Sequence, residues 1–391
     1  MPDKLDIATR CIHPAPIEDA HGAPHTPIYN TTTFVFPDTA ALIDMQTGKR
    51  EGGFYTRYGM NPTITALERQ LAPLEEAERA LAFSAGMAAI SATCLAYGRD
   101  GVVCVGDVYG GTMELVGNKL PQLGIAGRLL RDDEIADLDR TLEEQQASLL
   151  ILETPCNPTL AIRDIAQVAA IAHRHGALLA VDNTFATSIN QQPLKLGADL
   201  VIHAATKYLG GHSDITAGVV MGAAERLQPV WSWRKNLGQA PAPEVAALLS
   251  RSVRTLSVRV ERQNASALRI AEAMLEHPRV KRVLYPGLPQ FPGHKLARRQ
   301  MSGFGGMLTL DLDGDAQQTT AVVDSLELFL NAPSLGGVES LACQPFATTH
   351  YGLAADERQR RGITDSMIRL SVGLENPGDL IADLNRALEG R

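Results

Sequence analysis

Several common signals of function are missing from this chain of 391 residues. Its 36 basic residues are outnumbered by 44 acidic ones, so the net charge is −8 and no basic excess is available to neutralise nucleic-acid phosphates. No apolar run approaches the ~18–20 residues that a helix needs to cross a bilayer. We therefore expect neither a nucleic-acid partner nor a membrane partner.

Cysteine is scarce and scattered. The five cysteines form no C-x-x-C pair, which is typical of free thiols in a reducing compartment and not of a disulfide framework or a zinc site. The first six residues lack the apolar stretch of a secretory signal peptide. These absences predict a cytoplasmic protein without a metal site.

Nucleotide-binding signatures are missing as well. The chain has no Walker sequence, and the glycines at 303–306 are too closely spaced for a dinucleotide fingerprint. What remains is an ordinary globular composition, 45% hydrophobic and 20% charged. A chain of this length is large enough for two or three domains.

Short apolar runs alternate with stretches of helical spacing in the first two thirds of the chain. Strands are predicted at 102–105, 149–152, 178–181, 200–202 and 219–221. Helices are predicted at 62–74, 84–97 and 165–173. This alternation predicts an α/β fold in which helices cover both faces of a mostly parallel sheet.

The chain divides into three predicted parts. Residues 1–60 lack periodicity but carry large apolar groups such as Tyr29 and Phe34, which favours an ordered arm packed on a neighbouring subunit. Residues 61–245 form the α/β domain, and residues 246–391 a smaller α+β domain. That domain opens with one or two long helices over 245–275 and has strand candidates at 280–284, 307–312, 326–330 and 368–372. Four arginines are expected on the solvated face of its long helices: Arg251, Arg254, Arg259 and Arg262.

Polar residues occur where predicted strands end. Thr206 and Lys207 follow one strand, Asp182 ends another, and Tyr109 follows a third. Open α/β sheets bind ligands at the carboxyl ends of their strands. Taken alone, however, Lys207 is typical of a solvated surface lysine. Asp182 suits either a helix N-cap or the partner of a protonated ring nitrogen, and Tyr109 either a core residue or a ring stacked on a cofactor.

The sequence Ser84-Ala85-Gly86-Met87 marks a turn into a helix. Free N–H groups at a helix start attract anions, and glycine allows a phosphate to approach closely. A serine N-cap is the alternative interpretation. A phosphate cradle, a stacking ring, a carboxylate and a lysine are together the parts that pyridoxal 5′-phosphate (PLP) requires: an anchor, a Schiff-base lysine and an acid that keeps the pyridine nitrogen protonated.

A series of motifs runs through the whole chain in a fixed order. The motifs are Thr9…His13, Pro27-Ile28-Tyr29, Tyr55-Thr56-Arg57, Asn61-Pro62-Thr63, Ser84-Ala85-Gly86-Met87, Asp107-Val108-Tyr109-Gly110-Gly111-Thr112, Glu153-Thr154-Pro155-Cys156-Asn157-Pro158, Val181-Asp182-Asn183-Thr184, Thr206-Lys207-Tyr208, Ser334-Leu335-Gly336-Gly337-Val338-Glu339-Ser340 and Ile368-Arg369-Leu370-Ser371-Val372-Gly373. Together they resemble the PLP-dependent enzymes of cysteine and methionine metabolism (trans-sulfuration), the family of cystathionine γ-synthase, cystathionine γ-lyase and methionine γ-lyase.

This resemblance implies a PLP-dependent transferase-like fold, the fold type I of aspartate aminotransferase, with PLP as the cofactor. It implies that Lys207 forms the Schiff base and shuttles protons during catalysis. Asp182 would pair with the pyridine nitrogen. Tyr109 would stack on the ring and assist proton transfer near the leaving group.

The resemblance also implies how the phosphate is held. Gly86, Met87 and Thr206 would bind it, joined by Tyr55 and Arg57 from a neighbouring subunit. The expected assembly is therefore a homo-oligomer whose active sites are shared between subunits, an obligate dimer that is doubled to a tetramer in this family.

Three further residues are implied to bind an amino-acid substrate. Arg369 would clamp the α-carboxylate through its planar guanidinium, with help from Ser334 and Asn157. Glu339, within Gly-Gly-Val-Glu-Ser, resembles the synthase and γ-lyase pattern and is a further substrate-binding candidate.

The chain departs from the family pattern at two informative positions. Ala204 stands where the family usually has a serine that donates to the phosphate, which removes a contact of about 1 kcal/mol. Glu114 stands where synthases and γ-lyases carry an arginine that can meet a distal carboxylate. Glu114 either disfavours a substrate with a distal carboxylate, such as O-succinylhomoserine, or turns outward on its helix and touches nothing.

These residues predict a PLP-dependent carbon–sulfur lyase that acts at Cγ of a sulfur amino acid such as cystathionine or methionine. It would release a thiol, ammonia and a 2-oxo acid. The alternative is a transferase of the cystathionine γ-synthase type, which performs γ-replacement on O-acylhomoserine. A third hypothesis, a non-enzymatic scaffold, is disfavoured by the intact set of Lys207, Asp182, Tyr109 and Arg369.

Overall fold

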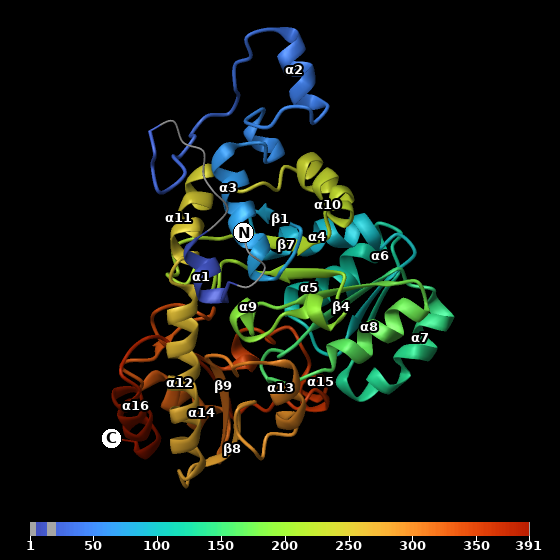
Figure 1. The fold of residues 1–391 in the computed structure, drawn as a ribbon. Helices are drawn as coiled ribbons and strands as arrows, with labels where there is room; N and C mark the ends of the chain where they lie inside the picture. The colour runs from blue at the N-terminus through green and yellow to red at the C-terminus, as the bar shows by residue number, and fades with distance from the viewer. Residues whose placement is uncertain (1–4, 14–20, 391) are drawn as a thin grey trace.

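Two sheets, each covered by helices, organise the chain. The computed structural model describes residues 5–13 and 21–390. Figure 1 shows the first sheet and its helices above the second, with the amino-terminal arm extending beyond the first region at the end opposite the second. Within the described residues, no helix is both long and apolar enough to cross a membrane. All five cysteines are free and buried, as their scattered spacing predicts.

The first sheet has seven strands in the order β1-β7-β6-β5-β4-β2-β3. Their bounds are β1 Arg79–Phe83, β2 Val102–Val105, β3 Gly127–Leu130, β4 Leu149–Glu153, β5 Leu178–Asp182, β6 Leu200–His203 and β7 Gly218–Gly222. The strands β3, β2, β4, β5 and β6 are parallel, whereas β7 runs antiparallel to both β6 and β1. The predicted mostly parallel sheet is confirmed. The apolar pattern had not revealed β1 and β3.

Helices cover both faces of this sheet. Cys104 of β2 packs in one apolar cluster with α4 (Gly86–Tyr97) and α10 (Ala224–Leu237). Its neighbours Val103 and Val105 pack in the opposite cluster with α7 (Leu138–Gln145) and α8 (Ile165–Arg174). Because both faces are buried, the strands are apolar throughout and do not alternate with polar residues.

The second sheet has five strands in the order β10-β11-β12-β9-β8. Their bounds are β8 Val280–Leu284, β9 Met307–Leu312, β10 Leu330–Asn331, β11 Leu341–Cys343 and β12 Met367–Ser371. The prediction of a strand over 326–330 is wrong except for Leu330. The Asp383 carboxylate accepts hydrogen bonds from the N–H groups of Glu327, Leu328 and Phe329, which are therefore not free to pair with a strand.

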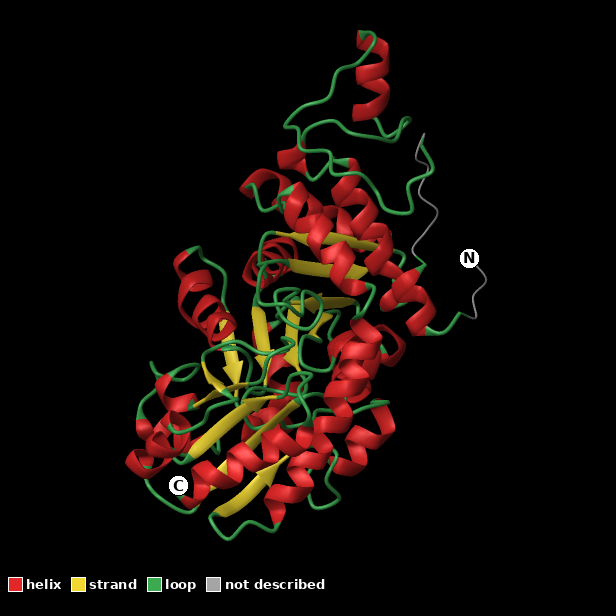
Figure 2. Ribbon diagram, turned by 90° about the vertical axis from the view of Figure 1, so that its left-hand side faces the viewer, coloured by secondary structure: helices red, strands yellow, loops and turns green. Residues whose placement is uncertain are grey.

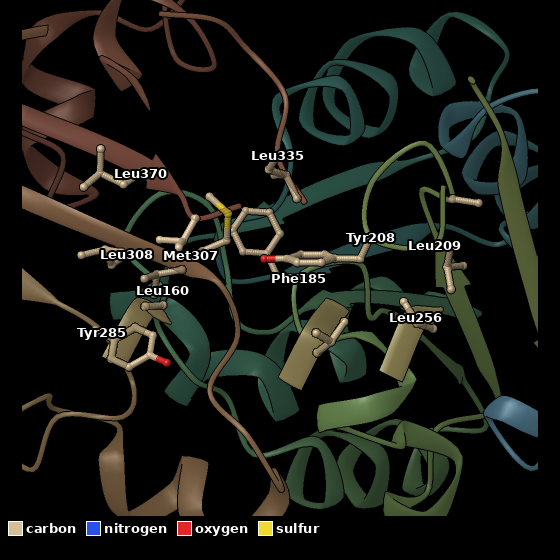
Figure 3. Close-up of a cluster of buried hydrophobic side chains, with 14 of the residues drawn as sticks. Leu160, Phe185, Tyr208, Leu209, Leu256, Tyr285, Met307, Leu308, Leu335 and Leu370 are labelled. Atoms are coloured by element: carbon tan, nitrogen blue, oxygen red, sulfur yellow. The ribbon is translucent and has the colours of Figure 1, made fainter. Parts of the chain in front are cut away.

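The long helix α12 (Leu256–Leu275) follows α11 (Pro243–Val253) and runs alongside both regions (Figure 1). Figure 2, turned by 90° about the vertical axis from Figure 1, shows the strands with helices packed around them. One apolar cluster continues across the junction between the two regions. Figure 3 shows Tyr208 beside Phe185, both from the first region, and near Leu335 from the second.

The long helices correct one prediction about their arginines. Arg251 and Arg262 are exposed as expected, but Arg259 is only 3% exposed and donates to backbone carbonyls. The amphipathic pattern did not show that this part of α12 is covered by a neighbouring turn.

The amino-terminal arm is irregular, with two short helices, α1 (Ile7–Ile12) and α2 (Thr39–Gln46). It leads into α3 (Pro62–Leu71). The arm leaves large apolar side chains exposed within the single chain, including Val35 at 97% and Ile28 at 54%. The remaining helical elements are η1 Thr56–Tyr58, η2 Ala72–Leu74, α5 Gly110–Glu114, η3 Leu115–Lys119, α6 Leu120–Gln122, η4 Asp132–Asp137, α9 Thr187–Asn190, η5 Pro193–Leu196, α13 His294–Gln300, α14 Ala316–Asp324, η6 Pro345–Ala347, α15 Ala355–Arg360 and α16 Pro377–Glu389.

Candidate active site

Lys207 lies in a tight turn that follows β6. The Lys207 N–H donates to the Ala204 carbonyl at 3.0 Å, and the Lys207 carbonyl accepts from Gly211 at 2.7 Å, so the backbone is fixed on both sides. Its side chain is half-buried, and Nζ donates to Ser334 Oγ at 2.7 Å. Burial, together with the nearby Arg369 guanidinium, holds the pKa of Lys207 below its ordinary value of 10.5. The interpretation of Lys207 as a solvated surface residue is therefore wrong.

The start of α4 lies against this turn. Ala85, not Ser84, is the N-cap, and it makes no side-chain cap, so the serine N-cap interpretation is wrong. A Cβ on Gly86 would lie 2.8 Å from the Ala204 Cβ, which shows how closely the helix start meets the lysine turn. The first turn of any helix leaves N–H groups without intrahelical partners. The N–H groups of Gly86 and Met87 have no partner among the residues that the structure describes, and they form a short cradle of donors near Thr206, whose own N–H donates to the Ala217 carbonyl at 3.1 Å.

Asp182 ends β5 and is 7% exposed. Its Oδ1 accepts from the N–H of Thr184 at 3.0 Å and from the Thr184 hydroxyl, whereas Oδ2 has no hydrogen-bond partner among the described residues. The Thr184 hydroxyl oxygen also accepts from the Ala204 N–H at 2.8 Å, which ties Asp182 to the lysine turn. Asp182 does not cap α9, because the N-cap of that helix is Ala186. Burial raises the pKa of Asp182, and the bonds from Thr184 oppose that rise.

Tyr109 is held at the end of β2 by a buried carboxylate. Its N–H donates to Glu153 Oε2 at 2.7 Å, while Glu153 Oε1 accepts from the Asn157 N–H at 3.3 Å. Tyr109 is 46% exposed, so it is not a core tyrosine and its ring is free to stack on a ligand. Burial and the neighbouring Asp182 carboxylate raise the pKa of Glu153 to about 8.

Arg369 joins the second sheet to the first. It lies on β12, is 3% exposed, and donates from Nη1 to Asn157 Oδ1 at 3.1 Å and from Nη2 to the Ser334 carbonyl at 2.7 Å. Its buried Nε has no partner among the described residues. Ser334 thus contacts both cations, with its hydroxyl on Lys207 and its carbonyl on Arg369. A φ of 101° holds its backbone in the left-handed half of conformational space.

The remaining predicted residues lie in three different places. Glu339 is half-buried and accepts a hydrogen bond from Ser213, in the loop that follows the lysine turn. Glu114 turns outward, where its side chain is 51% exposed and pairs with Lys119 at 3.2 Å. Tyr55 and Arg57 belong to the arm, and Arg57 donates to the Lys235 carbonyl at 2.9 Å. The structure therefore brings Glu339 near the lysine turn and leaves Glu114, Tyr55 and Arg57 outside the cluster of their own chain.

The cluster fits PLP. Asp182 offers an unpartnered carboxylate oxygen for a protonated ring nitrogen, Gly86 and Met87 offer free N–H groups for a phosphate, and Lys207 offers an amine with a lowered pKa. The unpartnered Arg369 Nε marks a place where a further acceptor can bind. Among the described residues, no group of three His, Cys, Asp or Glu could hold a metal ion.

Sequence reasoning did not assign a role to Glu153. The signal was present, since this carboxylate ends an apolar strand just as Asp182 does. Its register partner on the neighbouring strand is Asp182 itself. Two acids at the ends of adjacent parallel strands lie side by side. Glu153 therefore lies next to Asp182 while its own carboxylate binds the N–H groups of Tyr109 and Asn157.

Comparisons with known proteins agree with this geometry. A family model described as Cys/Met metabolism PLP-dependent enzyme matches residues 8–389. Cystathionine gamma-synthase 1, chloroplastic, of Arabidopsis thaliana is 42% identical over 366 residues, which cover 93% of this chain and 65% of that protein. L-methionine gamma-lyase of Pseudomonas putida is 41% identical, covering 98% of this chain and 97% of the lyase.

A solved structure matches equally well. Cystathionine gamma synthase from Xanthomonas oryzae pv. oryzae in complex with cystathionine superimposes with a TM-score of 0.92 at 37% identity, covering 99% of this chain and 98% of that one. The fold predicted from the sequence resemblance is therefore confirmed, and so is the dependence on PLP.

A pH prediction follows from Glu153. Its folded-state pKa is raised from 4.5 to about 8, so the stability that its protonated form contributes is complete below pH 4.5 and is lost as the pH rises through about 8. Glutamine cannot ionise. In thermal melts of the cofactor-free protein, the melting temperature of the unmodified chain should therefore fall relative to that of Glu153→Gln across this pH range. Parallel melting curves at all pH values would contradict the assignment.

Proposed function

This chain belongs to the Cys/Met metabolism PLP-dependent enzyme family, and from that premise we propose that it is a carbon–sulfur lyase acting at Cγ of a sulfur amino acid. Its substrates would be of the cystathionine or methionine type, and its products a thiol, ammonia and 2-oxobutanoate. The observation that carries this proposal is the pairing of Lys207 and Arg369 through Ser334.

The residues divide the work between binding and proton transfer. The Gly86 and Met87 N–H groups and Thr206 would hold the phosphate of PLP, Asp182 its ring nitrogen, and Tyr109 one face of its ring. When bound, PLP supplies an electron sink that stabilises negative charge on the carbons next to the substrate amino group.

Arg369 and Lys207 would act on neighbouring groups of the substrate, Arg369 on the α-carboxylate and Lys207 on the α-carbon. The Arg369 guanidinium is oriented by Asn157 and the Ser334 carbonyl, and it would bind the α-carboxylate. The Lys207 amine lies one hydrogen bond from the same serine, so a substrate bound to Arg369 has its α-carbon near a base. The lowered pKa of Lys207 allows it to take a proton from the α-carbon and carry protons to and from the β-carbon at neutral pH.

Position 114 favours elimination from a substrate without a distal carboxylate near this helix. Glu114 pairs with Lys119 and Asn118 of its own helical turn, so this position supplies no cation to a succinyl group. The Cγ–sulfur bond would break with the electrons leaving on sulfur, which Tyr109 would protonate. Water would then complete the reaction by releasing ammonia and the 2-oxo acid.

A γ-replacement transferase is the second candidate. It is favoured by the Arabidopsis and Xanthomonas relatives, which are both named cystathionine gamma-synthase. Glu339 beside the lysine turn suits either activity, because its motif resembles synthases and γ-lyases alike. The two candidates share the steps up to loss of the γ-substituent and differ in whether water or an incoming thiol ends the cycle.

A substrate panel separates the two. Purified enzyme is given L-cystathionine, L-methionine or O-succinylhomoserine, the last with and without cysteine, and 2-oxobutanoate and thiol are measured. We expect 2-oxobutanoate from cystathionine or methionine without any added thiol, and none from Lys207→Ala. If O-succinylhomoserine is the only one of these substrates that is turned over, and cysteine is incorporated when it is present, the transferase candidate is correct.

The arm supports a site that is shared between subunits. Arg57 lies on the arm and donates to the Lys235 carbonyl, which follows the lysine turn by 28 residues, and the arm exposes apolar side chains that water does not favour. A second copy that covers the arm would receive Tyr55 and Arg57 at its phosphate cradle. We propose a homodimer of this kind, doubled to a tetramer.

We also propose a cytoplasmic setting, which is supported by the five free, buried cysteines.

Subunit mixing tests the shared site. Lys207→Ala should lack the visible absorption band of lysine-bound PLP, and Arg57→Ala should bind PLP weakly, so neither variant is active alone. Refolding or exchanging them together creates hybrid dimers in which one of the two sites is intact. About a quarter of the sites should then recover activity if subunits mix at random. No recovery in verified hybrids would place Arg57 in its own chain's site.

A further inference from the structure

Two buried polar side chains lie one turn apart on α12 and face the active-site loops. Arg259 is 3% exposed and Gln263 is 0% exposed. Burying a guanidinium destabilises a fold unless its donors are satisfied, and apolar residues of similar volume would pack this helix without that cost. The positions of their hydrogen-bond partners therefore indicate what the two polar groups are for.

Arg259 binds the turn that carries Lys207. Its Nη1 donates to the Tyr208 carbonyl at 2.7 Å, and its Nη2 reaches the Leu209 carbonyl at 3.5 Å. The same Nη2 donates to the Ser252 carbonyl at 3.0 Å, at the end of α11, so the guanidinium is held from both sides. At Gly211, which has a φ of +69°, a Cβ would lie 1.9 Å from Arg259 Nη1. The turn after Lys207 is thus wrapped around this guanidinium, with no room for a side chain.

Gln263 binds the loop that carries Ser334. Its Nε2 donates to the Gly337 carbonyl at 2.8 Å. The same loop rests directly on the lysine turn, because a Cβ on Gly336 would lie 2.8 Å from the Tyr208 nitrogen. The Gly336 N–H is in turn held by Ser371 Oγ at 2.8 Å. Gln263 therefore fixes one end of the loop whose other end places Ser334 on Lys207 and Arg369.

The two residues share one rigid support. They lie four positions apart on a 20-residue helix, so their side chains project from the same face. One holds the segment after Lys207 and the other the segment after Ser334, and these segments come from different sheets. A change at either residue would therefore alter the separation of the two segments.

We propose that Arg259 and Gln263 are positioning residues that set the Lys207 Nζ to Ser334 Oγ contact, and thereby place the lysine amine for covalent attachment of PLP. This inference rests on the proposed function of Lys207. It gives α12 a role in positioning Lys207 that the sequence motifs around the lysine do not indicate. Neither side chain is assigned a contact with PLP or with the substrate.

A double-mutant cycle on PLP attachment tests the proposal. PLP is added to the cofactor-free protein, and the rate at which it becomes bound to Lys207 is followed by absorbance and by borohydride reduction with peptide mass spectrometry. Gln263→Leu, Ser334→Ala and the double variant are compared. Arg262→Met serves as the control, because Arg262 lies on the same helix and is exposed.

If Gln263 acts through Ser334, each single variant should slow attachment about tenfold, and the double variant should be no slower than the slower single one. Arg262→Met should leave the rate unchanged. Arg259→Lys keeps the positive charge but loses the planar pair of Nη donors. Combined with Ser334→Ala, it should show the same lack of additivity.

Two results would overturn the proposal. One is slowing that multiplies in the double variants, which indicates a general loss of packing. The other is a rate for Gln263→Leu equal to that for Arg262→Met. A failure of the proposed function has a different signature, since PLP would then bind Lys207→Ala as it binds the unmodified protein.

Discussion

The site depends on one hydrogen bond between two parts of the fold, from Lys207 Nζ to Ser334 Oγ at 2.7 Å. Lys207 follows a strand of the first sheet, whereas Ser334 lies in a loop beside the second. Neither segment determines where the other lies, so the bond requires the two regions to be held in one relative position. The buried Tyr208, next to Lys207, meets this requirement by packing across the junction, and α12 meets it by binding both segments (Figure 3).

Charge at the junction follows the same division. The acids Glu153 and Asp182 end neighbouring strands of the first sheet, where burial raises the pKa of both and the Asp182 carboxylate raises that of Glu153 further. Burial lowers the pKa of Lys207, and the guanidinium of Arg369, which comes from the second sheet, lowers it further. The first sheet therefore supplies two carboxyl groups, of which Asp182 would face a protonated ring nitrogen, and the second sheet supplies a guanidinium suited to a substrate carboxylate. The half-buried Lys207 amine has a larger uncharged fraction at neutral pH because its charged form is disfavoured, and only the uncharged amine can act as a nucleophile or base.

The sequence predicted the local features well and the long-range ones poorly. Strands such as β2 and β4 were found because buried parallel strands are continuous apolar runs. Asp182 was found because it ends such a run, and Lys207 because it follows one. The role of Arg259 was missed because helical periodicity shows which residues share a face but not what that face meets.

Other features needed knowledge of partners far along the chain. The strand predicted at 326–330 failed because Asp383, more than fifty residues later, takes its N–H groups. Glu114 remained open in the sequence because an outward and an inward rotamer suit the same helix, and the structure shows it paired with Lys119. The family motifs predict Arg369 and Ser334 as substrate residues, but only the fold shows that one serine contacts both the arginine and the lysine.

The most direct test of this account is the ionisation of Lys207 itself. The cofactor-free protein is treated briefly with an amine-acylating reagent over a range of pH, and modification of Lys207 is quantified by mass spectrometry against the exposed Lys281. Burial and Arg369 lower the pKa of Lys207, so it should become reactive at a lower pH than Lys281, and Arg369→Gln should move its curve upward. A Lys207 curve that coincides with that of Lys281 would contradict the placement of this lysine as the base of the site.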